Sequence, residues 1–135
     1  MPAESMLRLA DIAFASFHIL LTTFNLVGWI WPRTRRLHLV VLSGTLLSWF
    51  GLGVAYGWGY CPLTDWHWQV KHALGERGLP ASFVKYYADR VTGVSWDPAL
   101  VDGVVVALAF LALGLSIALN VQAWRRGTAG RSVSR

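Results

Sequence analysis

Three polar residues in an otherwise apolar stretch near the N-terminus could take part in chemistry. Asp11, His18 and Asn25 are seven residues apart, so they share one face of a predicted helix. Ionisable groups at membrane depth are costly, and they usually face a bundle interior where they transfer protons or hold cofactors. Asp11 and His18 are separated by about 10.5 Å of helix rise, too far for a direct hydrogen bond. Either a third group lies between them, or Asp11 lies at the outer interface while His18 hydrogen-bonds a neighbouring helix. We expect the stripe to face the other two spans.

A second candidate is the stretch GYCPLTDWHWQVKHALG at residues 59–75, which contains the only cysteine. Cys61, His67 and His72 have the spacing C-x5-H-x4-H, which lacks the short pairs that are typical of zinc sites. His67 and His72 lie about 140° apart around a helix. A thiolate and an imidazole could bind copper, although nothing in the spacing specifies it. No metal ligand or catalytic residue is therefore predicted.

The start of a helix explains more of this stretch. Thr64 is a favoured N-cap residue, and Asp65 places a negative charge at the positive end of a helix. Trp66 and Trp68 would then anchor the helix at the headgroups, with His67 exposed and dispensable for folding. We interpret five consecutive residues and one histidine elsewhere as structural motifs: Cys61, Pro62, Leu63, Thr64, Asp65 and His38.

A cofactor remains the alternative. A haem held by His18 and His38 is disfavoured because the two residues differ in depth by about 15 Å. His67 could reach His18 only if the outer helices dip inward. The alternative hypothesis is a membrane redox protein that binds haem, quinone or copper through His18, Asp11 and His67.

The elements that position these residues are membrane spans. Hydrophobic residues are 55% of the chain and charged residues 14%, against about 25% charged residues in soluble proteins. Residues 9–31, 37–58 and 103–124 are each long and apolar enough to cross a bilayer. Seven of the twelve basic residues follow the first and third spans, which places the C-terminus in the cytoplasm and the N-terminus outside. This placement also argues against nucleic-acid binding.

Two short amphipathic helices are predicted between the second and third spans. In the first, Trp66, Val70, Ala73 and Leu74 form the apolar face. The apolar face of the second helix consists of Phe83, Val84, Tyr87 and Val91. The residues expected to face water are Lys85, Asp89 and Arg90. The predicted fold is therefore an all-α membrane domain over residues 1–124 with an outer helical cap at 60–100. Residues 125–135 are expected to be a disordered basic tail.

Two pairs of small residues could allow close helix contacts. Gly53 and Gly57 form a G-x-x-x-G pair, and Gly114 and Ala118 form a similar pair in the third span. Each pair could pack within the bundle or contact another membrane protein or a second copy.

The order of motifs resembles a bacterial membrane family known as domain of unknown function 2784. The resemblance rests on LAD at 9–11, His18, RLH at 36–38, CPLT at 61–64 and SFVKYYADRVTG at 82–93. Many members have C-P-L-T-x-x-E, so His67 and the sequence DWHW indicate a divergent branch. The resemblance implies a small helical bundle in the bacterial cytoplasmic membrane, and it supplies no activity. From the residues themselves we expect a non-catalytic accessory subunit that contacts the lipid bilayer and presents an ordered cap.

Overall fold

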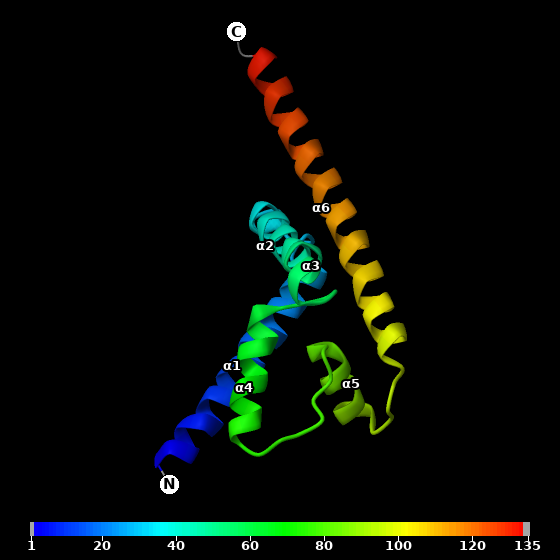
Figure 1. The fold of residues 1–135 in the computed structure, drawn as a ribbon. Coiled ribbons are helices and arrows are strands. Elements are labelled where there is room, and N and C mark those ends of the chain that lie inside the picture. Colours follow the sequence, from blue (N-terminus) through cyan, green and yellow to red (C-terminus); the bar gives the residue numbers. More distant parts are fainter. Residues whose placement is uncertain (1, 134–135) are drawn as a thin grey trace.

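All regular elements of the computed structural model are helices over the residues that it describes, 2–133 (Figure 1). This confirms the predicted all-α class. The elements are α1 (Pro2–Val27), α2 (Arg35–Leu47), α3 (Gly53–Tyr56), α4 (Pro62–Ala73), α5 (Phe83–Thr92) and α6 (Pro98–Val133), with a π-helical turn (Ser48–Leu52) joining α2 to α3.

Three helical segments are long and apolar enough to cross a membrane, as the sequence predicted. They are Pro2–Val27, Arg35–Tyr56 and Pro98–Thr128, and they make the chain a multi-pass membrane protein. The third begins five residues earlier than expected. Asp97 caps it, because its carboxylate accepts a hydrogen bond from the backbone N–H of Leu100 at 2.9 Å.

The C-terminal tail differs from the expectation. The sequence predicted disorder over 125–135, but α6 continues as helix to Val133, and residues 134 and 135 lie outside the described part. The tail contains no proline that would remove a backbone hydrogen bond, so the helix of the third span can extend into it.

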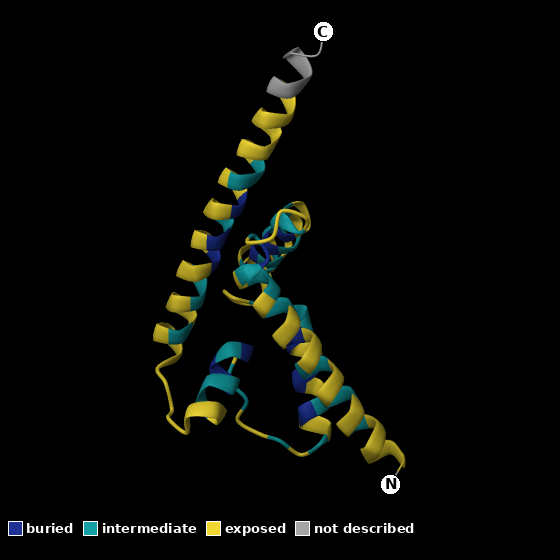
Figure 2. Cartoon of the chain, turned by 180° about the vertical axis from the view of Figure 1, so that it is seen from behind, coloured by how far each residue is buried: buried dark blue, intermediate teal, exposed yellow. Residues whose placement is uncertain are grey.

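The helices cross rather than form a tight bundle (Figure 1). α1 and α4 lie side by side, α6 packs against α2, and α5 lies between α1 and the start of α6. Buried positions face these contacts, whereas the outward sides of α1 and α6 are exposed (Figure 2). Leu42 and Leu46 of α2 pack on Ala109 and Ala112 of α6, whose small side chains permit close approach.

The turn between α1 and α2 depends on close contact at Gly28. The hydroxyl of Thr34 donates to the Gly28 carbonyl at 2.6 Å, and the guanidinium of Arg35 donates to the Trp29 carbonyl at 3.0 Å. These donors satisfy carbonyls at the end of α1 that have no partner within the helix. A Cβ on Gly28 would lie only 2.9 Å from the His38 ring and 2.7 Å from the Phe24 carbonyl.

Gly28→Ala is therefore expected to destabilise the fold by about 1–3 kcal/mol, since a well-packed site must move to admit the methyl group. The free energy of unfolding in mixed detergent micelles measures this effect. Gly44→Ala is the matched control, because a Cβ there meets nothing within 4 Å. Equal losses in the two variants would contradict the close packing at Gly28.

The two outer helices exist as predicted, but α4 buries the opposite face from the one expected. Thr64, His67, Trp68 and Lys71 are buried, whereas Trp66 is 57% exposed. The reason is the partner surface. Because α1 presents the carboxylate of Asp11 toward α4, His67 and Lys71 turn inward beside Trp68, and Trp66 is left outward.

The predicted face of α5 also needs correction. Phe83 is buried as expected, but Lys85 and Tyr86 are buried too, and Val91 is 83% exposed. Lys85 does not face water because it forms an ion pair with Asp89 one turn along the helix.

The two small-residue pairs lie in different surroundings. Gly53 is buried, and a Cβ there would lie 3.3 Å from the backbone of Trp58, while Gly57 ends α3 with a φ of 107°. Gly57 therefore serves a turn and not a helix face. Gly114 and Ala118 are exposed on α6, where a Cβ on Gly114 would meet nothing within 4 Å.

Candidate functional site

Asp11 of α1 lies against two residues of α4. Its Oδ1 atom is 2.7 Å from Nε2 of His67 and 3.0 Å from Nζ of Lys71. His67 and Lys71 are four residues apart, so one face of α4 brings both to the same carboxylate. The structure therefore brings together two of the three predicted cofactor residues, Asp11 and His67.

The contact continues into the segment after α4. Nζ of Lys71 is 3.1 Å from the carboxylate of Glu76, which also accepts from the hydroxyl of Tyr86 at 2.7 Å. Arg90 lies 3.4 Å from the same carboxylate. We name this group the outer cluster, and its members are Asp11, His67, Lys71, Glu76, Tyr86 and Arg90.

The carboxylates and cations of the outer cluster stabilise one another's charged forms. Burial alone would lower the pKa of Lys71, but its hydrogen bonds with Asp11 and Glu76 outweigh burial and raise this pKa above its ordinary value. Burial would raise the pKa of Glu76, but the hydrogen bonds from Tyr86 and Lys71 lower it overall. Two anions and two cations thus compensate one another beside the neutral Tyr86 and His67.

His67 is fully buried, in contrast to the exposed position expected from the sequence. Its Nε2–H donates to Asp11, while Nδ1 is buried with no hydrogen-bond partner. Burial lowers the pKa of His67 more than the Asp11 hydrogen bond raises it. The imidazole is therefore neutral at pH 7, with an unused acceptor on Nδ1.

The stability of the cap is expected to fall as the pH is lowered below 6.5. The pKa of His67 is lower in the fold than its ordinary value of 6.5, so only the unfolded chain gains a proton there just below pH 6.5. Glu76, with a pKa below its ordinary 4.5, adds a further loss at lower pH. The raised pKa of Lys71 gives stabilisation that is complete below pH 10.5 and is lost only at higher pH.

Amide hydrogen exchange of residues 62–92, corrected for intrinsic rates, measures this pH effect. We expect less protection at pH 5 than at pH 7.5, while α6 serves as the internal control. Equal corrected protection of the cap at both pH values would show that His67 does not link protonation to folding.

His18 lies deeper along α1 and packs against α5. Its ring stacks on Phe83 with centroids 3.7 Å apart, and its Nδ1 atom is buried without a partner. His67 is also a ring neighbour of Phe83, at 6.1 Å. A planar cofactor held by both imidazoles would have to displace Phe83. The predicted stripe therefore faces the cap at Asp11 and His18, and only Asn25 faces a span.

A second polar group joins the three spans at the other end of α1. Nε2–H of His38, which is fully buried, donates to the backbone carbonyl of Asn25 at 2.9 Å, and the Ser116 hydroxyl lies 3.0 Å from Nδ1. The Asn25 amide donates to the hydroxyl of Thr45 at 2.9 Å. The Asn120 amide lies 3.5 Å from the Ser116 hydroxyl and donates to the Arg35 carbonyl at 3.1 Å. We name this group the inner cluster, and its members are Asn25, His38, Thr45, Ser116 and Asn120.

The capping interpretation of CPLT holds in outline but not in register. Cys61 is the N-cap residue and Pro62 is the first residue of α4, where proline is favoured. Thr64 makes no cap hydrogen bond and is buried in the first turn. Asp65 accepts from the hydroxyl of Tyr60 at 3.1 Å.

Metal-ligating groups do not converge in the described residues. Cys61 lies at the start of α4 as a free thiol, and no cluster of three or more His, Cys, Asp and Glu side chains within residues 2–128 could hold a metal ion. His72 instead contacts the backbone carbonyl of Glu76 through Nδ1 at 3.0 Å.

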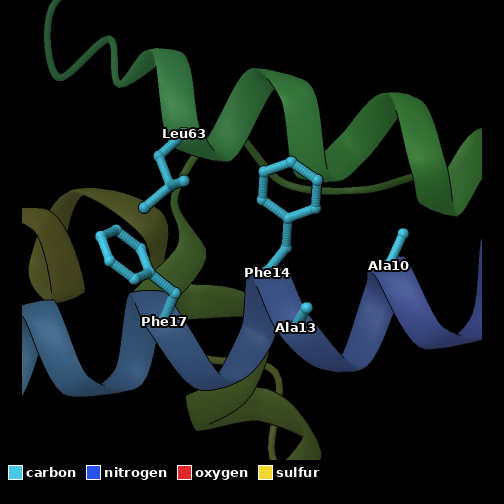
Figure 3. Close-up of a pocket in the computed structure, with 5 residues that line it drawn as sticks. All are labelled: Ala10, Ala13, Phe14, Phe17 and Leu63. Atoms are coloured by element: carbon cyan, nitrogen blue, oxygen red, sulfur yellow. The ribbon is translucent and has the colours of Figure 1, made fainter.

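Two shallow grooves flank the outer cluster. One, of about 330 Å³, lies between α1 and α4 and is lined by alanine, phenylalanine and leucine side chains. Figure 3 shows Phe14 and Phe17 pointing from α1 toward α4, and Leu63 pointing back toward α1. The other, of about 340 Å³, lies between α1 and α5 and includes Phe83. The first lining is apolar, whereas the second adds the hydroxyls of Thr22, Thr23 and Thr92 to an otherwise mostly apolar surface.

Several cluster members were not found by sequence reasoning. Lys71 had a usable signal, since it lies four residues after His67 and therefore on the same helix face. The sequence gives no comparable signal for Glu76 and Tyr86, because Glu76 lies in a loop and Tyr86 lies in another helix. Ser116 and Asn120 are also four residues apart on a charge-free span, a spacing that could have marked them as a polar contact.

The fold and the two clusters define a multi-pass helical membrane protein with an ordered cap held to its first span. The family model of DUF2784, described as a protein of unknown function, matches residues 8–121, and the chain belongs to this family. No curated protein and no solved structure matches the chain.

Proposed function

We propose that the protein is a non-catalytic accessory subunit that displays a fixed outer cap and associates with another membrane protein through its spans. The observation that carries this proposal is the buried Lys71, whose ammonium bridges Asp11 of α1 and Glu76 beyond α4. A cation paired on two sides is a structural bridge, since breaking such a pair is strongly unfavourable. It supports a cap that is rigid relative to α1.

The exposed sides of the spans support the association. Within the most apolar window of each span, the chain buries only 11%, 22% and 17% of the residues. α6 is exposed along most of its outward side (Figure 2). Gly114 and Ala118 lie there, and small residues allow the backbone of another membrane helix to come close. We therefore place the partner on this side of α6.

We further propose that the cap lies outside the bacterial cytoplasmic membrane and that the C-terminus lies in the cytoplasm. The support is the position of Arg33, Arg35 and Arg36 between the first two spans, together with the arginines after the third. In intact spheroplasts that carry Cys61→Ser, a membrane-impermeant maleimide is expected to label a cysteine introduced at Gly78 but not one introduced at Arg33. The reverse pattern would overturn this orientation.

Site-specific photocrosslinking in cells tests the proposed association. A photoreactive residue at Gly114 is expected to give one discrete protein adduct that is heavier than the 15.0 kDa chain. Leu20 is the matched control, because it is 68% exposed on the first span and away from the small-residue pair. Adducts with lipid alone at both positions, or a homodimer at Gly114, would contradict an accessory role.

A further inference from the structure

Most basic side chains within residues 2–128 have a partner in the fold, and four arginines do not. The partnered ones pair with carboxylates or donate to backbone carbonyls: Arg8, Arg35, Lys71, Arg77, Lys85 and Arg90. The other four are exposed and make no hydrogen bond or ion pair with another described residue. We name them the basic collar: Arg33, Arg36, Arg125 and Arg126.

The basic collar lies at one end of the membrane spans. Its first two members lie on either side of Arg35 at the start of α2, and the Arg35 carbonyl accepts a hydrogen bond from the Asn120 amide at 3.1 Å. Arg125 and Arg126 follow Asn120 on α6 by about 7.5 and 9 Å of helix rise. The contact between Asn120 and Arg35 therefore brings both pairs of arginines to the same end of the spans.

Two exposed tryptophans mark this end as the headgroup layer of the bilayer. Trp31 is 56% exposed and precedes Arg33 by two residues, and Trp124 is 68% exposed and directly precedes Arg125. Indole rings prefer the level of the lipid headgroups. The guanidinium groups beside these tryptophans are therefore at the depth of the lipid phosphates.

The chain itself brings little negative charge to the basic collar. Residues 12–64 and 103–135 contain no aspartate or glutamate. α6 continues past the other helices toward its C-terminus (Figure 1), and its residues 121–128 are all exposed (Figure 2). Within the described residues, the charge of the basic collar is therefore neither paired nor covered.

We propose that the basic collar binds the headgroups of anionic phospholipids. A guanidinium donates two parallel N–H groups to a phosphate, so it suits a lipid headgroup better than a point charge would. Basic clusters next to a membrane helix are attracted to anionic lipids, by a factor of about five for each arginine near the surface. This inference is independent of the proposed accessory role, and it holds for either orientation of the chain in the membrane.

The arrangement of the arginines favours lipids over an acidic segment of a partner protein. Arg125 and Arg126 are consecutive, so they point about 100° apart around α6. The other two arginines belong to α2 and to the turn before it. Side chains that point in several directions suit separate headgroups around the protein, whereas one acidic segment would need a single shared face.

Spin-labelled lipids test this proposal. The full chain is reconstituted into phosphatidylcholine vesicles with a trace of spin-labelled phosphatidylglycerol or spin-labelled phosphatidylcholine. The spectra separate lipid held at the protein from bulk lipid and give the ratio of the two association constants. For the wild type we expect a preference for phosphatidylglycerol of about fivefold or more. In 1 M salt the ratio should approach one, because the Debye length falls to about 3 Å.

Matched variants locate the binding. Arg33→Gln/Arg36→Gln and Arg125→Gln/Arg126→Gln are each expected to lower the ratio, and the fourfold variant should lose most of the preference. Either pair carries the test should the other fail to reconstitute. Glu4→Gln/Arg8→Gln is the control, since it removes an exposed arginine that already has a carboxylate partner, and it should keep the wild-type ratio.

Three results would overturn the proposal. They are a wild-type ratio near one, a preference that persists in 1 M salt, and an unchanged ratio in the fourfold variant. A wild-type ratio near one, together with crosslinking of the basic collar to a protein in cells, would assign these arginines to an acidic partner instead.

Discussion

Lys71→Met is expected to detach the outer cap from α1. The variant keeps the length and the apolar stem of the side chain but removes the ammonium that lies between Asp11 and Glu76. Both carboxylates then lose their main cationic partner. We expect a loss of about 3 kcal/mol in the free energy of unfolding, at the low end for a broken buried pair because the two carboxylates are partly exposed.

The loss should be confined to the cap. Hydrogen exchange is expected to increase over residues 62–92 while the contact between α2 and α6 keeps its protection. Glu4→Gln is the matched control, since it breaks the exposed ion pair with Arg8 and should cost less than about 0.5 kcal/mol. Similar losses in Lys71→Met and Glu4→Gln would show that Lys71 is not a structural bridge.

His38→Ala is expected to loosen the contact between the three spans by about 3 kcal/mol, since it removes a fully buried ring. The same change removes the hydrogen bonds of the His38 ring to the Asn25 carbonyl and the Ser116 hydroxyl, and Ser116 keeps longer contacts of 3.5 Å with the Arg35 carbonyl and the Asn120 amide. Hydrogen bonds inside membranes contribute modestly, about 0.6 kcal/mol on average, so most of the loss comes from packing. Denaturation by sodium dodecyl sulfate in mixed micelles measures it.

His72→Ala provides the comparison for His38→Ala. His72 is exposed, and its Nδ1 atom lies 3.0 Å from the backbone carbonyl of Glu76. Its own backbone carbonyl accepts a hydrogen bond from the guanidinium of Arg77, which the substitution does not remove. Its removal should change the free energy of unfolding by less than about 1 kcal/mol. A loss in His38→Ala that is no larger than this would contradict the role of the inner cluster.

The spans and outer helices could be predicted because they depend on local pattern. A run of about 20 apolar residues specifies a membrane helix by length alone. The family could be recognised from short motifs spread over residues 9–93, and the family model matches residues 8–121. The stripe of Asp11, His18 and Asn25 was also visible, because seven residues are close to two helical turns.

The inward faces of the outer helices could not be predicted by the same reasoning. Hydrophobic periodicity assumes that only apolar side chains pack inward, yet α4 also buries His67 and Lys71 because α1 offers a carboxylate to them. Nothing in the local sequence of α4 records what lies opposite. The prediction that Thr64 is the N-cap residue was wrong for a local reason, because Pro62, two residues earlier, already begins the helix.

The central claim is that Asp11 and Lys71 interact across α1 and α4, and a double-mutant cycle measures this interaction directly. The free energy of unfolding is determined for the wild type, Asp11→Leu, Lys71→Met and the double variant. We expect a coupling energy of about 2 kcal/mol, within the range for residues in direct contact in one ion-pair network. A coupling energy indistinguishable from zero, with both single variants folded, would contradict the claim that this pair holds the cap to the first span.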